Sequence, residues 1–156
     1  MNTKRYTLYA NRFSSGFTAI ELLVVVAIIA LLAAVGGLIG FDALGRSSVH
    51  SERDLLVSLL TSARARALAN VNEKGHGIHI NLNEFVIFEG TTYNISDPKN
   101  RSVGRNTGVT VTTVPANADI IFNQLSASVV IPVGISITQG GQTDVVDINS
   151  QGRVEW

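Results

Sequence analysis

The stretch RFSSGFTAIELLVVVAIIALLAAVGGLIGF, residues 12–41, decides how this chain is built. Its last 20 residues, Leu22–Phe41, carry no charge. As an α-helix rising about 1.5 Å per residue they would extend about 30 Å, which matches the apolar thickness of a bilayer. We therefore predict a single membrane-spanning helix. Glu21 stands directly before this run, where a carboxylate is unfavourable unless it has a partner.

Charge is distributed unevenly along the 156 residues. The chain has 12 Lys and Arg against 12 Asp and Glu, and the first 16 positions contain Lys4, Arg5 and Arg12 but no acid. The remaining nine basic and twelve acidic residues give residues 17–156 a formal net charge of −3. Basic residues that precede an apolar span stay in the cytoplasm, so we predict a single pass with the N-terminus inside. The acidic balance of the remainder disfavours general binding to nucleic acid.

The apolar run has alternative interpretations. A secretory signal peptide also has a basic start and an apolar core, and LLAAVGG (residues 31–37) could contain its cleavage site. The chain would then be a secreted or signal-anchored extracytoplasmic globular domain. Neither a signal peptide nor a plain anchor explains Glu21. A cut between Gly16 and Phe17 would explain it, because the new α-amino group would lie one helical turn from the carboxylate, in the same helix or in a shifted neighbour.

The segment GFTAIELLVVVAIIALLA, residues 16–33, resembles the processing and assembly segment of type IV pilins and type II secretion pseudopilins. The shared pattern is a glycine before the cut, an aromatic residue after it, a glutamate at the fifth mature position and then an apolar helix. The resemblance implies that a prepilin peptidase cuts between Gly16 and Phe17 and methylates the new N-terminus of Phe17. It also implies that Glu21 pairs with the N-terminus of a neighbouring subunit during filament assembly.

The same resemblance implies a location and partners. The chain would lie in the cytoplasmic (inner) membrane, surrounded by lipid, until an inner-membrane assembly platform adds it to other pilin or pseudopilin subunits. It would then belong to an extracytoplasmic filament or the cell surface. The predicted domains are a leader (residues 1–16), a transmembrane and assembly helix (17–41), an amphipathic continuation of the helix (42–72) and a β-rich head (73–156).

The residues after the apolar run keep a helical pattern. Apolar side chains recur at steps of three and four and therefore share one face of a helix. These residues are Leu56, Leu60, Ala63, Ala67 and Val71. We expect this face to pack on the part of the chain that follows.

From residue 73 the pattern changes to the alternation that is typical of strands. We predict about six short strands, with a hairpin through Asn83, a turn at Gly140 and Gly141, and a polar loop over Ser96–Gly108. Strands are expected at residues 78–82, around Phe85 and Ile87, and at 109–114, 118–123, 128–139 and 143–156. The predicted fold class is α+β: a long N-terminal helix, membrane-spanning in its first half and amphipathic in its second, packed on an antiparallel β-sheet head, as in pilins.

Two further segments resemble the FimT/GspH minor pseudopilins: RDLLVSLLTSARARALA (residues 53–69) and DINSQGRVEW (residues 147–156). This second resemblance implies a minor filament component. Some members of that group bind DNA for uptake through an arginine-rich version of the C-terminal turn. Here Glu155 stands where a second arginine would be needed, so DNA binding by that route is not expected.

Four basic residues are candidates for contacts with DNA phosphates or an anionic surface. They are Lys99, Arg101, Arg105 and Arg153. The alternative function would be a DNA-binding tip subunit for DNA uptake or adhesion, and the ordinary explanation is a solvated loop.

The sequence contains no motif for catalysis, a cofactor or a metal. There is no cysteine, and no nucleophile and base form a recognisable pair. His76 and His79 are three residues apart on a predicted strand and so point to opposite faces, where we expect exposed or edge histidines rather than metal ligands. We therefore predict a structural protein and not an enzyme.

Overall fold

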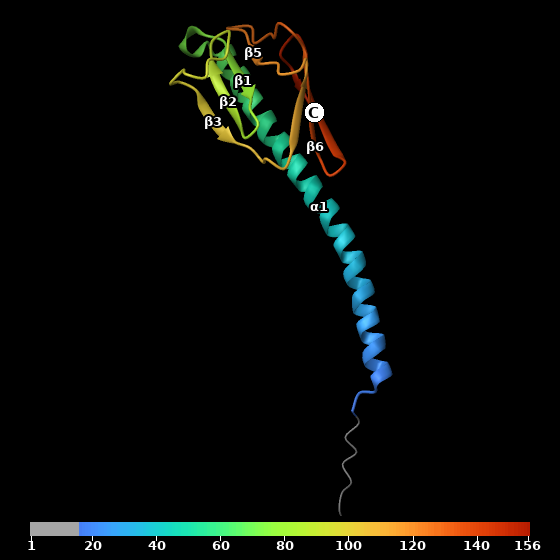
Figure 1. Ribbon diagram of the computed structural model, residues 1–156. Coiled ribbons are helices and arrows are strands. Elements are labelled where there is room, and N and C mark those ends of the chain that lie inside the picture. The colour runs from blue at the N-terminus through green and yellow to red at the C-terminus, as the bar shows by residue number, and fades with distance from the viewer. Residues whose placement is uncertain (1–15) are drawn as a thin grey trace, which may run out of the picture. The chain divides into compact units, whose positions relative to one another are not determined.

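The computed structural model describes residues 16–156, except for the side chains of residues 35–45 (Figure 1). The predicted leader, residues 1–16, lies outside this part apart from Gly16. Contacts within the chain separate residues up to Ile39 from residues Gly40–Trp156, and each unit is described by itself. The elements are α1 (Ala19–Leu68), the short 3-10 helix η1 (Val71–Glu73), β1 (His76–Ile80), β2 (Glu84–Glu89), β3 (Arg101–Gly104), β4 (Thr110–Val114), β5 (Ile120–Phe122), β6 (Val133–Gln139), β7 (Gln142–Ile148) and β8 (Val154–Glu155).

The first unit contains the beginning of α1. Among the described residues no helix combines the length and the apolar character that a membrane span requires. The span predicted at Leu22–Phe41 continues into residues 35–45, whose side chains are outside the described part.

The second unit, which we call the head, packs the later part of α1 with two antiparallel sheets. Sheet A has the strand order β3-β2-β1-β5, and sheet B has the order β4-β6-β7-β8. All pairings are antiparallel. The α+β prediction of a helix packed on antiparallel strands is therefore confirmed, but the described residues form eight strands in two sheets rather than about six strands.

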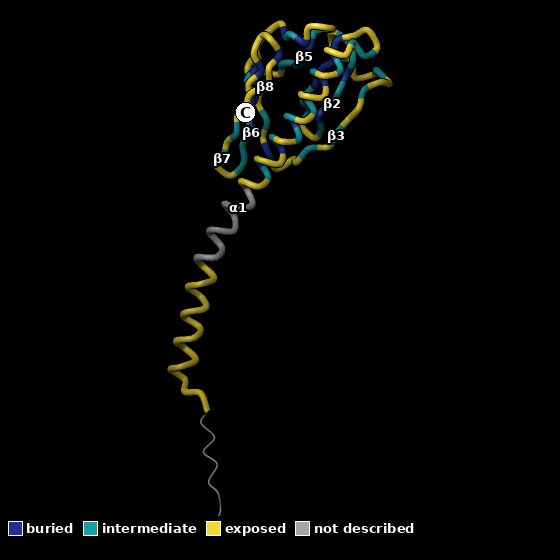
Figure 2. The backbone as a smooth tube through the Cα atoms, turned by 180° about the vertical axis from the view of Figure 1, so that it is seen from behind, coloured by how far each residue is buried: buried dark blue, intermediate teal, exposed yellow. Residues whose placement is uncertain are grey.

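The helix face predicted from the sequence is the one that is buried. Leu56, Leu60, Ala63 and Ala67 are all completely buried. They belong to one core with residues of both sheets, including Ile78, Phe85, Ile120, Phe122, Ile135, Ile137, Val146 and Ile148. Figure 2 shows these buried positions spread over the strands and the helix of the head.

The helix ends earlier than predicted. Its last residue is Leu68, and Val71 lies in η1, half-buried, instead of continuing the buried face. The chain reverses at Asn70 and Asn72, which have left-handed φ angles of 54° and 56°. Asparagine adopts this conformation more readily than most residues, which explains why the helix stops here.

The predicted hairpins are present. In the first, the Asn81 N–H donates to the Glu84 carbonyl and closes the turn between β1 and β2. In the second, Gly140 and Gly141, with φ angles of 57° and 80°, join β6 to β7. Two consecutive left-handed residues suit the twist of a two-residue hairpin, and glycine adopts them without strain.

The predicted polar loop over Ser96–Gly108 is wrong in one part. Residues Arg101–Gly104 form β3, which pairs with β2 from Glu84↔Gly104 to Ile87↔Arg101. The sequence of β3, RSVG, has one large apolar residue, so alternation could not reveal it. The strand expected over 128–139 begins only at Val133, after Pro132, because proline cannot donate to a ladder.

Gly77 lies where β1 has no room for a side chain. A Cβ atom there would be 2.5 Å from the ring of Phe88 and 2.8 Å from the carbonyl oxygen of Ile120. The Phe88 ring is itself buried and packs on Tyr93 with ring centroids 5.6 Å apart. Because Gly77 has no side chain, β2, β5 and the ring of Phe88 can pack closely against β1.

We expect Gly77→Ala to lower the free energy of unfolding by about 1–3 kcal/mol, because the buried ring and the backbone of β5 must move. The matched control is Gly104→Ala, at a strand glycine with nothing within 4 Å of an added Cβ. Urea denaturation of the full chain in detergent micelles, followed by circular dichroism, measures both variants. Equal effects at the two glycines would contradict the packing described here.

Candidate functional site

The start of α1 is built around Thr18 and Glu21. The Glu21 carboxylate oxygen Oε2 accepts hydrogen bonds from the Thr18 backbone N–H and from the Thr18 hydroxyl, both at 2.8 Å. The Thr18 Oγ1 in turn accepts the Glu21 N–H at 3.3 Å. This reciprocal arrangement is a capping box, which pairs donors that the first turn of a helix otherwise leaves free.

The capping box leaves half of the carboxylate available. Both bonds from Thr18 go to Oε2, and Oε1 makes no hydrogen bond within the described residues. Glu21 is therefore oriented by its own helix while it presents one oxygen to solvent. A cation from outside the helix could bind this oxygen without breaking the cap.

The residues at the predicted cleavage site are accessible. Gly16 is exposed and no atom lies within 4 Å of the position of a Cβ on it. The side chain of Phe17 is 87% exposed. Both residues precede Thr18 and Ala19, so they lie outside the hydrogen-bonded helix, where a protease could bind an extended backbone.

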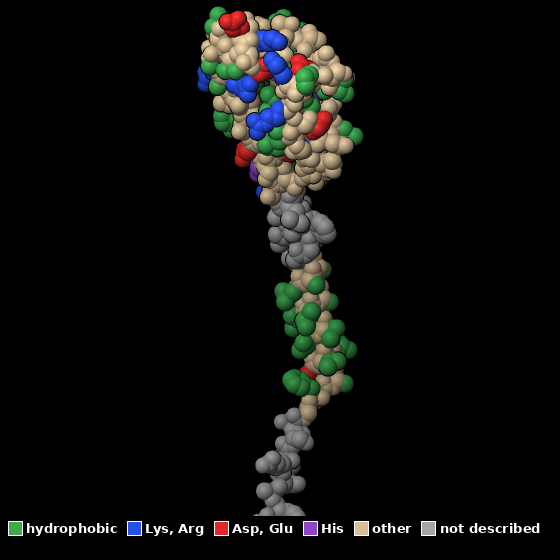
Figure 3. Space-filling view, turned by 90° about the vertical axis from the view of Figure 1, so that its left-hand side faces the viewer, with side chains coloured by type: hydrophobic (Ala, Val, Ile, Leu, Met, Phe, Trp, Pro, Cys, Tyr) green, Lys and Arg blue, Asp and Glu red, His purple; other side chains and the backbone are tan. Residues whose placement is uncertain are grey.

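The described helix residues after this site present apolar side chains in every direction. Every residue from Phe17 to Ala34 is exposed. The large apolar side chains among them are Phe17, Ile20, Leu22, Leu23, Val24, Val25, Val26, Ile28, Ile29, Leu31 and Leu32. Figure 3 shows them in green along this stretch. A helix that is apolar all round must be covered by lipid or by other helices.

Arg105, one of the four candidate basic residues, is not on the surface. Its side chain is 3% exposed, and its Nε donates to the Glu52 carboxylate at 3.0 Å. The two terminal nitrogens donate to the carbonyl oxygens of Asn81 at 3.0 Å and Val109 at 2.8 Å. The guanidinium also lies over the ring of Phe85, 5.3 Å from its centroid. Arg105 is therefore neither in a solvated loop nor placed to contact DNA phosphates or an anionic surface.

The other three candidates do not form one patch. Lys99 lies 3.8 Å from the carboxylate of Glu89, and Arg153 lies 3.3 Å from that of Glu155. Arg101 is exposed and has no ion pair among the described residues. It lies in β3, on the opposite side of the head from β8, beside which Arg153 stands (Figures 1 and 2). Figure 3 shows acidic side chains among the basic ones on the face it presents.

Glu89 accepts hydrogen bonds from polar side chains of two other segments. It accepts from Arg66 at 2.9 Å and from the Asn72 amide at 2.8 and 2.9 Å, and its own side chain is only 8% exposed. These contacts join the last turn of α1, the reversal after it and the end of β2. Arg66 is therefore a structural residue of the head.

His76 and His79, two of the three histidines, occupy different environments. His76 is completely buried, and its Nε2 lies 3.0 Å from the Val71 carbonyl oxygen, so the expectation of an exposed or edge histidine is wrong there. His79 is half-buried, with Nδ1 2.6 Å from an Asp119 oxygen and its ring stacked on Tyr93 at 4.0 Å. Among the described residues no group of acidic or histidine side chains is arranged to hold a metal ion.

Sequence reasoning missed two residues of these sites. Thr18 could have been found, because T-x-x-E in TAIE, residues 18–21, is the pattern of a capping box. Glu52 also carried a signal, since it precedes Leu56 by four residues and so lies on the buried helix face.

Comparisons with known proteins identify a fold. No family model matches the chain, and no curated protein is significantly similar to it in sequence. Among solved structures, the type IV minor pilin FimU of Pseudomonas aeruginosa strain PAO1 is similar, with a TM-score of 0.58 and 19% sequence identity. The match covers 70% of this chain and 88% of the FimU chain. The chain therefore has a pilin-like fold.

We expect Thr18→Val to loosen the first turn of α1, because the valine side chain can neither accept the Glu21 N–H nor donate to the Glu21 carboxylate, and only the bond from the backbone N–H of residue 18 remains. Losing a threonine cap should make the Glu21 amide exchange about five-fold faster. Hydrogen exchange by NMR on the full chain in detergent micelles measures this rate. Thr18→Ser, which keeps the hydroxyl, is the control, and equal exchange in the two variants would contradict the cap.

For the buried ion pair, we expect Arg105→Met to lower the free energy of unfolding by about 3–5 kcal/mol, because Glu52 would stay buried without its partner. The double variant Glu52→Leu, Arg105→Met buries no charge and should lose less than the two single variants together. Arg153→Met, at an exposed pair, should change little. Additive single effects in urea denaturation would contradict the pairing.

Proposed function

We propose that this chain is a subunit of a type IV pilus or type II secretion-like filament and that it assembles through its N-terminal helix. The observation that carries the proposal is the site at the start of α1. There a single carboxylate, Glu21, accepts hydrogen bonds from Thr18 at Oε2 and leaves Oε1 exposed, and the helix that follows is apolar on all sides. The pilin-like fold of the chain supports the same proposal.

The apolar helix surface supports insertion before assembly. Burying the ten large apolar side chains of this part of the helix is worth roughly 15–30 kcal/mol relative to water. We propose that the helix first lies in the inner membrane as a single pass, N-terminus inside, and later in the core of the filament. The proposed segments are the leader (1–16), the transmembrane and assembly helix (17–41), the amphipathic part of the helix (42–72) and the β-rich part of the head (73–156).

Transfer from lipid to a bundle of helices gains little from the hydrophobic effect, because both environments are apolar. A specific attraction must therefore guide assembly. We propose that a prepilin peptidase cuts between Gly16 and Phe17 and methylates Phe17, and that the new ammonium group of one subunit binds the free Oε1 of Glu21 in the next. Such a charged hydrogen bond is strong where water is excluded.

The role within the filament is proposed to be that of a minor subunit of the FimT/GspH type, added by the inner-membrane platform among other pilin or pseudopilin subunits. The two sequence segments that resemble this group support it. A DNA-binding tip subunit has less support, because Arg105 is buried, and Lys99 and Arg153 each lie beside an acid.

Expression of the full chain with a prepilin peptidase and an assembly platform tests the proposal. We expect intact-mass analysis to find a mature chain that begins at N-methylated Phe17, and Gly16→Ala to remain uncut. Glu21→Gln keeps the side-chain shape without the charge and should be cut but enter filaments about ten-fold less.

The matched control is Glu73→Gln, at an exposed glutamate of the head. It should be processed and assembled like the unchanged chain. A mature start near residue 37, or a chain that still begins at Met1, would contradict the proposal. Normal assembly of Glu21→Gln would contradict the role of the carboxylate and leave the processing step standing.

A further inference from the structure

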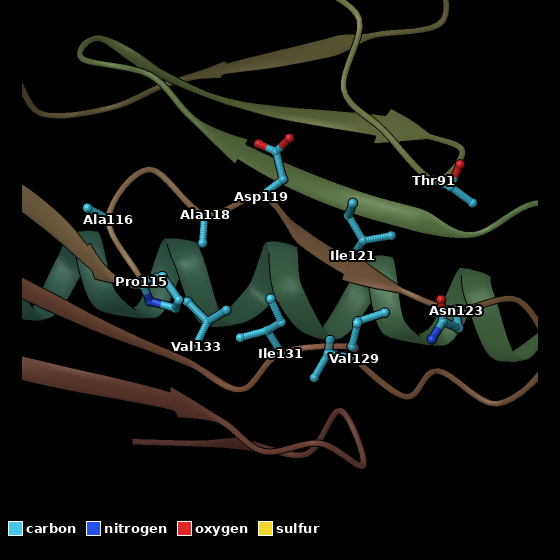
Figure 4. Close-up of a pocket in the computed structure, with 11 residues that line it drawn as sticks. Thr91, Pro115, Ala116, Ala118, Asp119, Ile121, Asn123, Val129, Ile131 and Val133 are labelled. Atoms are coloured by element: carbon cyan, nitrogen blue, oxygen red, sulfur yellow. The ribbon is translucent and has the colours of Figure 1, made fainter.

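A groove crosses the head between β5 and residues 129–133, the segment that leads into β6 (Figure 4). Its volume is about 490 Å³, within the range of ligand-binding pockets. Its walls are mainly apolar, with Ile121 on one side and Val129, Ile131 and Val133 on the other. Pro115 and Ala118 line one end.

The groove runs along the free edge of sheet A. β5 is the last strand of that sheet and pairs only with β1 among the described strands. The carbonyl oxygens of Ile120 and Phe122 face β1, since they would lie 2.8 and 2.9 Å from a Cβ on Gly77 and Gly75. Backbone groups alternate sides along an antiparallel strand, so the N–H and C=O of Ile121 point away from β1.

The neighbouring segment leaves this edge open. The Asn123 N–H donates to the Ser128 carbonyl at 2.9 Å, which brings residue 128 beside the outer edge of β5. One residue later the Val129 N–H donates instead to the Ser150 carbonyl of the turn before β8. The chain from Val129 onward therefore leaves the edge of β5 and leads into β6 of sheet B, which begins at Val133, and no strand of the described residues pairs with β5 beside Ile121.

The charges of the residues around the groove indicate which kind of peptide segment could bind there. The one ionisable side chain among the lining residues is Asp119, and its carboxylate oxygen Oδ1 lies 2.6 Å from Nδ1 of His79. The exposed side chains that line the groove carry no charge: Val130 is 81% exposed and Ile131 is 57% exposed, and Thr91 is polar but uncharged. An uncharged segment matches these walls, whereas a charged one would lose hydration without gaining a partner.

We propose that the groove binds an extended, uncharged segment of a partner protein as an additional strand on β5. Its backbone would pair with the N–H and C=O of Ile121, and its apolar side chains at alternate positions would contact Val129 and Ile131. Addition of a strand to an open edge is an established mode of peptide recognition. This activity of the head goes beyond assembly through the helix and does not depend on processing or on Glu21.

The test uses the isotope-labelled full chain in non-ionic detergent micelles and the blocked peptide acetyl-Thr-Val-Thr-Val-Thr-amide. We expect saturable NMR shifts centred on the Ile121 amide and about ten-fold slower exchange of that amide at saturation. The same peptide with N-methyl groups at alternate residues cannot pair by its backbone, and a version with glutamate in place of threonine carries charge. Both should bind about ten-fold more weakly or not at all.

Variants of the chain complete the test. Ile121→Pro removes the N–H that faces the groove but no bond to β1, and Val130→Asp places a charge on the rim at an exposed position. Both should weaken binding about ten-fold, whereas Val145→Asp, at an exposed apolar residue of β7 outside the groove, should not. Absence of shifts at Ile121 overturns the proposal. Equal binding of the N-methylated peptide, or unchanged binding by Val130→Asp, overturns it as well.

Discussion

The buried ion pair between Glu52 and Arg105 is the contact on which the arrangement of the head depends. It joins three segments that lie far apart in the sequence: α1, the turn between β1 and β2, and the link from β3 to β4. Both charges are fully bonded, because Glu52 also accepts the Asn106 N–H and Arg105 satisfies two carbonyl groups. A buried pair adds little to stability by itself, but it disfavours every packing in which one partner lacks the other. It therefore acts chiefly on which arrangement of helix and strands is adopted.

The two parts of α1 have different surface patterns, although they belong to one continuous helix. In the head, one face of α1 is buried against strands and the opposite face is polar, so tertiary packing decides its orientation. From Leu22 to Ala34 the helix is apolar and exposed on all sides. The capping box at Thr18 and Glu21 gives this apolar part a defined beginning. Thr18 and Glu21 thus lie at the end of the described helix where a protease and a neighbouring subunit are proposed to act.

Much of this could be predicted from the sequence wherever the signal is local. The buried face through Leu56 and Leu60 follows from the helical period, and the turn at Gly140 and Gly141 follows from turn chemistry. Contacts between residues that are distant in the sequence could not be predicted, because they leave no local pattern. Nothing near Arg105 indicates its burial, because its partner is 53 positions away. Strand pairing across the chain, such as β5 with β1, likewise leaves no periodic trace, so the division into two sheets and the strand β3 could not be predicted.

The position of the capping box relative to Gly16 determines what a cut there can change. Every atom of the box belongs to Thr18 or Glu21, on the mature side of the scissile bond. The proposed processing would thus create a positive charge without making or breaking any bond of the helix start. Proteolysis would alter the electrostatics and leave the conformation alone. In kinetic terms, the start of the helix would already be folded in the membrane before the cut. The cut, which is irreversible, would then determine when assembly begins and would not be a step of folding.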